Sequence, residues 1–335
     1  MAKNILNIED LHVSFDTYAG EVQAVRGVTY HVDEGEVLAV VGESGCGKSV
    51  TAQTIMRLNP EPPARIKSGT LTLDGIDIVN STEEEKQKIR SKEVSMIFQD
   101  PMTCMNPTMI VGKQIVEAIK HHQKLSKEEA EAKAIEMLKK VQIPNAEERA
   151  KQYPHQFSGG MRQRAMIAMA LSCNPKLLIA DEPTTALDVT IQAQIIDLLA
   201  EIRETMGTAI ILITHDLGVV ASLADRIAVM YAGKIVESGA TKDIFYNPSH
   251  PYTSALLASL PKHDTNKEDK LTSIPGTPPD LVNPPVGCAF AARCEKCMKI
   301  CKTKQPPVFD LGNNHESACW LLHKDCPSSM KEGQK

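Results

Sequence analysis

The chain has 335 residues, of which 42% are hydrophobic, so it is long enough to form two or three structural units with substantial cores. Its net charge is -5, and charged residues of both signs are present. This gives no electrostatic reason to expect nucleic acid as the main ligand. No stretch approaches the roughly 20 apolar residues of a membrane-spanning helix, and the N-terminus lacks the apolar core of a secretory signal. We therefore expect a globular cytosolic protein.

The N-terminal part of the chain alternates β-rich runs with turns, as in LNIEDLHVSF, AVRGVTYHV and SGTLTLDGIDI. These runs predict strands, several of them antiparallel, that lead into one glycine-rich loop. From about residue 110 to residue 151 the sequence becomes charged and helical. One face of the predicted helix KEEAEAKAIEMLKKV is expected to be packing surface; it carries Ala130, Ala134, Met137, Leu138 and Val141.

The second half of the chain changes pattern after Ser158. A helix, MRQRAMIAMALSC, is followed by the apolar strands KLLIAD and TAIILITHD, with another helix between them. Apolar strands that alternate with helices predict a parallel sheet buried on both faces. Beyond Asn247 the composition shifts to proline-rich connections, which predicts a separate appendage after the main domain.

The glycine-rich loop in VLAVVGESGCGKSV follows an apolar strand and precedes a helix. Its spacing of Gly42, four residues, Gly47, Lys48 and Ser49 is the P-loop pattern in the context that the pattern requires. The N–H groups of such a loop bind phosphate oxygens, with Lys48 as a point charge and Ser49 as a Mg²⁺ ligand. The predicted ATP contacts in this loop are Gly42, Ser44, Gly45, Cys46, Gly47, Lys48, Ser49 and Val50.

Two acidic residues lie at the end of the strand in KLLIADEP, at the carboxyl edge where α/β sheets bind ligands. We expect Asp181 to hold Mg²⁺ and Glu182 to polarise the attacking water as general base. The strand ILITHD brings His215 to the same edge. The alternative for Glu182 is that its carboxylate only caps the following helix.

Six motifs occur in the order found in ABC transporter ATPase subunits, which the chain resembles over roughly residues 5–240. They are the P-loop, Gln99 in MIFQDP, FSGGM at residues 157–161, the strand that ends at Asp181 and Glu182, TALD at residues 185–188, and His215. The resemblance implies an α/β fold: a P-loop (RecA-like) core with an antiparallel β-subdomain, an α-helical subdomain and a small C-terminal metal-binding extension. The expected boundaries are 1–95 and 160–245 for the core, 96–159 for the helical subdomain and 246–335 for the extension.

The resemblance also implies that two ATP molecules are sandwiched head to tail between two such domains. Gln99 would contact Mg²⁺ and the attacking water, and His215 would contact the γ-phosphate. Asp188 would couple the two sites across the dimer interface. Because Glu182 and His215 are both present, we expect a site that hydrolyses ATP.

The motif FSGGM corresponds to the family's signature motif. Ser158, Gly159 and Gly160 would donate hydroxyl and N–H groups to the γ-phosphate of the ATP on the opposite subunit, which suits a helix N-terminus. Phe157 and Met161 depart from the commonest form, LSGGQ, at its two ends. The Ser-Gly-Gly core is kept, so the ATP contact is expected to be intact.

The adenine ring needs an aromatic face, which the family takes from the end of the first strand. Phe15 is the better positional match. Tyr18 is the alternative, because DTYAG lengthens this hairpin. Phe15 could instead simply pack inward in the sheet.

The strings IFYNPSHPYTSALLASLP and IPGTPPDLVNPPVGCAFAARC resemble the tail of ATP-binding subunits of dipeptide and oligopeptide importers. The resemblance implies a peripheral protein on the cytoplasmic side of the membrane. Its partners would be a second ATPase subunit, two permease subunits and a peptide-binding protein. The permeases would contact the segment PMTCMNPTMIVGKQIVEAI, whose exposed methionines would suit an adaptable interface. Ordinary core packing in the helical subdomain is the alternative for this segment. Import of nickel or another small solute is an alternative, as is a soluble ABC ATPase that acts on DNA or ribosomes.

Four cysteines occur in the short string GCAFAARCEKCMKIC at residues 287–301. Cytosolic thiols are kept reduced, so this density indicates a metal site and not disulfides. The resemblance assigns Cys288, Cys294, Cys301 and Cys319 to a [4Fe-4S] cluster, which some family members hold. Structural Zn²⁺ and unoccupied thiols are the alternatives, and Cys297 could replace Cys301 as a ligand.

Overall fold

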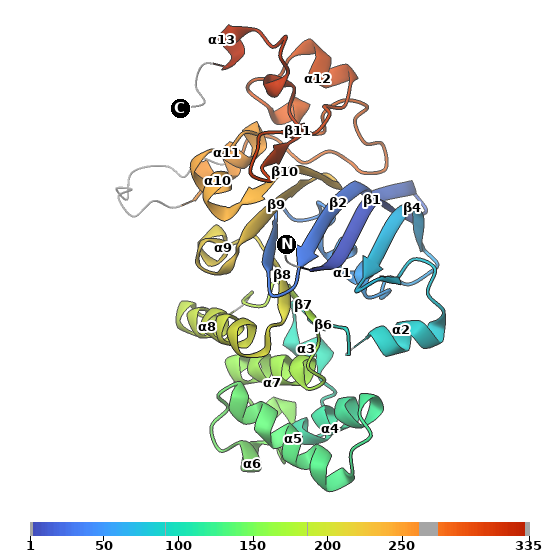
Figure 1. The fold of residues 1–335 in the computed structure, drawn as a ribbon, viewed down its shortest axis with the longest axis vertical. Helices are drawn as coiled ribbons and strands as arrows, with labels where there is room; N and C mark the ends of the chain where they lie inside the picture. Colours follow the sequence, from blue (N-terminus) through green and yellow to red (C-terminus); the bar gives the residue numbers. More distant parts are fainter. Residues whose placement is uncertain (1–2, 91, 186, 261–273, 332–335) are drawn as a thin grey trace.

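The computed structural model describes residues 3–90, 92–185, 187–260 and 274–331. One of its sheets is antiparallel, with the strand order β2-β1-β4-β5, and is built on the long β1–β2 hairpin (Figure 1). Leu6, Ile8 and Val13 of β1 belong to its buried face. The predicted antiparallel strands are confirmed. They are β1 (Asn4–Thr17), β2 (Gly20–Asp33), β4 (Ala64–Leu73) and β5 (Ile76–Asp77).

The larger sheet has the order β11-β12-β10-β9-β3-β8-β7-β6, and its strands from β9 to β6 pair in parallel. β3, β7 and β8 are buried along their whole length, as expected for a parallel sheet covered on both faces. The strands are β3 (Val37–Val41), β6 (Val94–Ile97), β7 (Leu177–Asp181), β8 (Ala209–Thr214), β9 (Arg226–Tyr231), β10 (Lys234–Ala240), β11 (Phe309–Asp310) and β12 (Glu316–Ser317).

Helices cover both faces of the parallel strands. Leu178 and Leu212 pack in one apolar cluster with α7 and α8, whereas the alternate residues Ile179 and Ile211 pack with α1 on the other face. This alternation follows from the two-residue period of a strand. The helices around the core are α1 (Lys48–Ile55), α2 (Glu83–Ile89), α7 (Gly159–Leu171), α8 (Val189–Met206) and α9 (Leu217–Leu223).

A group of helices lies at one end of the molecule (Figure 1). The apolar stripe predicted for residues 130–141 is buried here against α4 and α7, which confirms it as packing surface. The α5 helix begins with a capping box, in which the Ser126 side chain accepts from the Glu129 N–H and the Glu129 carboxylate accepts from the Ser126 N–H. The elements are α3 (Pro101–Cys104), α4 (Val111–His122), α5 (Lys127–Lys140), α6 (Ala146–Arg149) and the 3-10 turn η1 (Pro154–Gln156).

The C-terminal region lies at the opposite end of the molecule and packs against the core (Figure 1). Its strand β12 pairs with β10 and extends the larger sheet. Its Phe290 and Tyr252 pack on Tyr231 of β9, with ring centroids 5.3 and 4.6 Å away. The elements are α10 (Thr241–Tyr246), α11 (Pro251–Ala258), η2 (Ala291–Arg293), α12 (Lys299–Thr303), η3 (Trp320–Leu322) and α13 (Ser328–Lys331). Residues 261–273 of the predicted extension lie outside the described residues.

A buried carboxylate on β10 holds this region in place. Glu237 accepts hydrogen bonds from the N–H groups of Ser249 (2.6 Å) and His250 (3.0 Å) and makes a 2.8 Å contact with Nε2 of His315. Its side chain is completely buried, so losing these partners would leave a costly buried charge. None of the described helices is both long and apolar enough to cross a membrane.

Candidate nucleotide and cysteine sites

The P-loop connects β3 to α1, as predicted. Gly42 and Gly47 have positive φ angles of 152° and 104°. A Cβ atom on Gly42 would collide with the carbonyl oxygen of Met230, and one on Gly47 with that of Ala24. Only glycine therefore fits at these two positions, and the loop curls closely against the strands behind it.

The Lys48 side chain turns back over this loop. Its Nζ donates to the carbonyl oxygens of Gly42 (2.7 Å) and Glu43 (3.0 Å), although the residue is only 6% exposed. A buried ammonium needs such partners, and the oxygens of a bound phosphate are of the same chemical kind. The loop and Lys48 can thus form an anion site.

Ser49 and Asp181 meet at the end of β7. The Ser49 hydroxyl donates to Oδ1 of Asp181 at 3.0 Å. Burial raises the pKa of Asp181, and the bond from Ser49 opposes that rise. A hydroxyl and a carboxylate side by side are oxygen ligands of the type that Mg²⁺ prefers.

Glu182 lies at the centre of the three predicted catalytic side chains. Its Oε2 accepts from Nε2 of Gln99 (2.7 Å) and from the Thr185 hydroxyl (2.9 Å), and its Oε1 is 3.5 Å from Nδ1 of His215. The backbone of Glu182 is in the left-handed region, with φ at 48°, which is strained for a residue with a side chain and typical of functional sites. No role was predicted from the sequence for Thr185 of the TALD motif. The signal that could have predicted its contact with Glu182 is a hydroxyl three residues after a candidate base.

The signature and coupling residues begin helices. The Ser158 hydroxyl oxygen accepts from the Met161 N–H (3.3 Å) at the start of α7, and the Asp188 carboxylate accepts from the Ile191 N–H (3.0 Å) at the start of α8. Gly160 lies close to Ile191, so the two helix starts are packed together. Their contact with a second subunit stays a prediction. Ala186 of the TALD motif lies outside the described residues.

The two candidate adenine platforms differ in exposure. Phe15 is partly buried and packs against the apolar cluster beneath the antiparallel sheet. Tyr18 is fully exposed at the turn of the β1–β2 hairpin. The contact of either ring with adenine stays a prediction.

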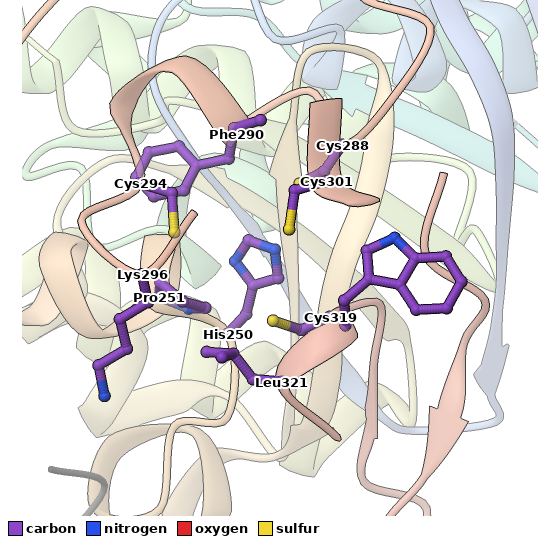
Figure 2. Close-up of a pocket in the computed structure, with 11 residues that line it drawn as sticks. His250, Pro251, Cys288, Phe290, Cys294, Lys296, Cys301, Cys319 and Leu321 are labelled. Carbon is purple, nitrogen blue, oxygen red and sulfur yellow. The ribbon is translucent and has the colours of Figure 1, made fainter. Parts of the chain in front are cut away.

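The four cysteines assigned by resemblance line one pocket, together with Phe290, Trp320 and Leu321. Figure 2 shows the labelled cysteines around the imidazole ring of His250. Cys297 and Cys326 are not among the residues that line this pocket, so the structure brings Cys301 to it and not Cys297. The cysteines are Cys288, Cys294, Cys301 and Cys319, and all are free thiols.

The thiols of this pocket are held in an apolar environment. Burial raises the pKa of Cys288, that of Cys294 to about 11 and that of Cys319 to about 12. Thiolates there would need a cation for compensation. Among the described residues, no three His, Cys, Asp or Glu side chains form a group that could hold a metal ion. The free space between the side chains is about 10 Å³, enough for one water-sized group.

Among the described residues that line the pocket, His250 contributes the one imidazole. Its Nδ1 accepts from the Tyr252 N–H at 3.0 Å, and burial lowers its pKa to about 4, so the ring is neutral with its proton on Nε2. That buried Nε2 has no hydrogen-bond partner in the part of the chain that the structure describes. A buried donor of this kind needs an acceptor, and none of the thiol groups supplies one here.

A second hollow, of about 390 Å³, lies on the helical end of the molecule. Met109 and Met169 line it, but Met105 is 2% exposed and belongs to the core, so the prediction of exposed methionines is wrong for Met105. The spacing of apolar residues in PMTCMNPTMIVGKQIVEAI did not distinguish the methionines that line the hollow from the one in the core. The other lining residues are Cys104, Asn106, Gln114, Glu117, Ala118, His121 and His122.

Comparisons with known proteins agree with these sites. A family model described as "ABC transporter" matches residues 25–185, and one described as "Oligopeptide/dipeptide transporter, C-terminal region" matches residues 236–301. The oligopeptide transport ATP-binding protein OppD of Bacillus subtilis (strain 168) is 59% identical over 323 residues, which cover 96% of this chain and 90% of that protein. This chain belongs to the ABC transporter family.

Another relative and a solved structure are also similar to this chain. The dipeptide transport ATP-binding protein DppD of Bacillus subtilis (strain 168) is 55% identical and covers 99% of this ABC protein and 98% of its own length. Among solved structures, the ATP-binding cassette MJ0796, in a dimeric post-hydrolysis state bound to ADP and Pi, is 27% identical with a TM-score of 0.63. That match covers 70% of this chain and 98% of the cassette. The chain is an ABC ATPase, for which ATP and Mg²⁺ are the expected ligands.

Proposed function

We propose that this ABC ATPase energises the uptake of dipeptides and oligopeptides across the cytoplasmic membrane. The observation that supports this substrate class most strongly is the match of residues 236–301 to the C-terminal region of oligopeptide and dipeptide transporters. The relatives OppD and DppD, which carry those names, are similar over more than 90% of this chain. The ATPase would be peripheral, on the cytoplasmic side.

The nucleotide site would divide its work among the residues around β7. Ser49, Asp181 and Gln99 would hold Mg²⁺, since their side chains supply oxygen atoms. Glu182 would accept a proton from the attacking water, and its 2.7 Å bond to Gln99 would keep its carboxylate in place. His215 would contact the γ-phosphate from the neighbouring strand.

Adenine would lie against the aromatic ring at the end of β1, with Phe15 as the preferred platform and Tyr18 as the alternative. The other nucleotide contacts would come from the P-loop. Gly42 and Gly47 would bring the backbone close to the phosphates, with Ser44, Gly45, Cys46 and Val50 completing the loop.

Two ABC ATPase subunits would enclose ATP at their interface. The start of α7 is formed by Ser158, which caps the helix, and by Gly159 and Gly160. Their N–H groups could donate to the phosphate of an ATP bound on the facing subunit. Asp188, at the start of the neighbouring α8, would couple the two sites. In this arrangement residues 1–95 and 160–245 form the nucleotide-binding core, 96–159 the helical subdomain and 246–335 the extension.

Two permease subunits would bind at the helical end, and a peptide-binding protein would deliver substrate on the other side of the membrane. The hollow lined by Met109 and Met169 supports this location, because methionines adapt to the shape of a partner. Apart from Met169, its lining residues belong to the segment that follows Gln99, so a movement of Gln99 at the γ-phosphate would be transmitted to the permease contact.

The extension would hold a [4Fe-4S] cluster on Cys288, Cys294, Cys301 and Cys319. All-sulfur donors suit such a cluster, and the orphaned Nε2 of His250 faces the same pocket, where sulfide or thiolate sulfur would accept from it. The small free space means that the side chains would have to move apart on loading. Zn²⁺ is the alternative, and it would need three or more ligands drawn together around one ion.

Purification of the tagged chain from solubilised membranes tests the transporter assignment. We expect two hydrophobic permease subunits to co-purify with it in stoichiometric amounts. Co-purification with ribosomes or DNA, and with no permease, would contradict the proposal.

A further inference from the structure

The C-terminal region reaches back to the nucleotide loop and holds one of its residues. Glu43, the residue after Gly42, makes a bidentate ion pair with Arg293: Nη1 is 2.5 Å from Oε2, and Nη2 is 2.9 Å from Oε1. The backbone N–H of Glu43 also donates to the Tyr252 hydroxyl oxygen at 2.9 Å. Both of these partners come from the region that follows the core, 200 residues or more along the chain.

Arg293 is fixed on its other sides. It donates to the carbonyl oxygens of Pro275 (2.9 Å) and Ile274 (3.2 Å) and to the Tyr231 hydroxyl (3.2 Å). Its side chain is only 4% exposed, whereas that of Glu43 is 27% exposed. A guanidinium with all its directions occupied has little freedom, and the next residue is Cys294 of the cysteine pocket.

The charge of Glu43 matters because of what this loop binds. A carboxylate beside a site for triphosphate repels it, and the repulsion is strong where water is excluded. The bidentate pair compensates that charge and fixes the carboxylate on Arg293. Removal of Arg293 would leave Glu43 without its counter-charge.

We propose that Arg293 is a positioning residue for the nucleotide site: through Glu43 it neutralises and shapes the P-loop, and so makes ATP affinity depend on the C-terminal region. Arg293 does not touch ATP in this scheme. It acts only through Glu43. The segment from Arg293 to Cys294 is therefore one structural connection between the cysteine pocket and the P-loop.

The test measures binding of MgATP to the full-length chain by titration calorimetry, with Glu182→Gln in every variant to prevent hydrolysis. Arg293→Met is expected to weaken binding by about tenfold at low salt and by less at about 0.5 M salt, where charges are screened. The double variant Glu43→Gln with Arg293→Met is expected to return within about twofold of Glu43→Gln alone, because the uncompensated carboxylate is gone.

A milder substitution, tested with and without Glu43→Gln, keeps the test independent of how well the Arg293→Met variant folds. Arg293→Lys keeps the charge but loses the bidentate geometry, and is expected to weaken binding by about threefold, again removed by Glu43→Gln. Arg203→Met is the matched control, since Arg203 also joins a carboxylate, Asp225, and a carbonyl oxygen, that of Gly35. It should leave the affinity unchanged.

The results separate an electrostatic role from a purely structural one. Recovery by Glu43→Gln and a salt-dependent loss support the proposal. Unchanged affinity in both Arg293 variants would overturn it, and so would a loss that Glu43→Gln does not repair.

Discussion

Gln99 and Glu182 are joined by a 2.7 Å hydrogen bond between side chains that are 83 residues apart in the sequence. The bond connects the segment that enters the helical end of the molecule with the candidate base at the end of β7. A change at the γ-phosphate that alters this bond would therefore also change the position of the segment at the proposed permease contact. This pair is a direct structural connection between the candidate catalytic site and the segment of the proposed permease contact.

Glu182→Gln should lower the rate of ATP hydrolysis by about a thousandfold, because an amide cannot accept the proton of the attacking water. ATP binding should persist, so the variant should form stable dimers with ATP. Phosphate release from the purified transporter measures the rate, and size-exclusion chromatography the dimers. Glu128→Gln, at an exposed position of α5, is the matched control. Hydrolysis at the normal rate in the Glu182 variant would remove this residue as the base.

Phe15→Leu should raise the KM for ATP by about tenfold with little change in kcat, because leucine keeps most of the apolar packing but offers no aromatic face. Steady-state ATPase kinetics check this. Tyr18→Leu is the parallel variant and should leave the KM for ATP unchanged. If only the Tyr18 change raises KM, the exposed ring is the adenine platform and the preference for Phe15 is wrong.

Cys288→Ser should abolish the brown colour, with absorption at about 400 nm, that we expect of protein purified without oxygen. The reason is that the cluster needs each of its four thiolates. Iron and acid-labile sulfide analysis provides the measurement, and Cys326→Ser, outside the pocket, is the control. Colourless wild-type protein with stoichiometric zinc would disprove the cluster.

The ion pair between His315 and Glu237 predicts a pH dependence. The hydrogen bond to this carboxylate raises the pKa of His315 above its ordinary value of 6.5. Its stabilising contribution is therefore complete below about pH 6.5 and is lost as the pH rises through the raised pKa. Thermal unfolding of the full chain should show stability falling over this window, and His315→Gln should flatten the fall. Parallel curves for the two proteins would contradict it.

Contiguous motifs made much of this molecule predictable. The P-loop, the strand that ends at Asp181 and the apolar stripe from Ala130 to Val141 each depend on local spacing, which a sequence displays directly. That Gln99 and Glu182 lie in one site was predicted from the family's motif order and not from any local pattern.

The parts that sequence reasoning missed depend on long-range pairing. β6 has only four residues, and β11 and β12 have two each, so none of them shows a strand periodicity. The sequence therefore showed no sign that β12 pairs with β10 and extends the larger sheet. The pair between Glu43 and Arg293 spans 250 residues and leaves no trace in local composition.

Peptide uptake by the purified transporter in proteoliposomes, with the binding protein present, is the most direct measurement of whether ATP cleavage at Glu182 drives import. We predict that labelled oligopeptide accumulates only when MgATP is present on the ATPase side, and that Glu182→Gln stops both uptake and phosphate release. Uptake that continues in the Glu182 variant, or wild-type ATP hydrolysis that never moves peptide, would contradict this function.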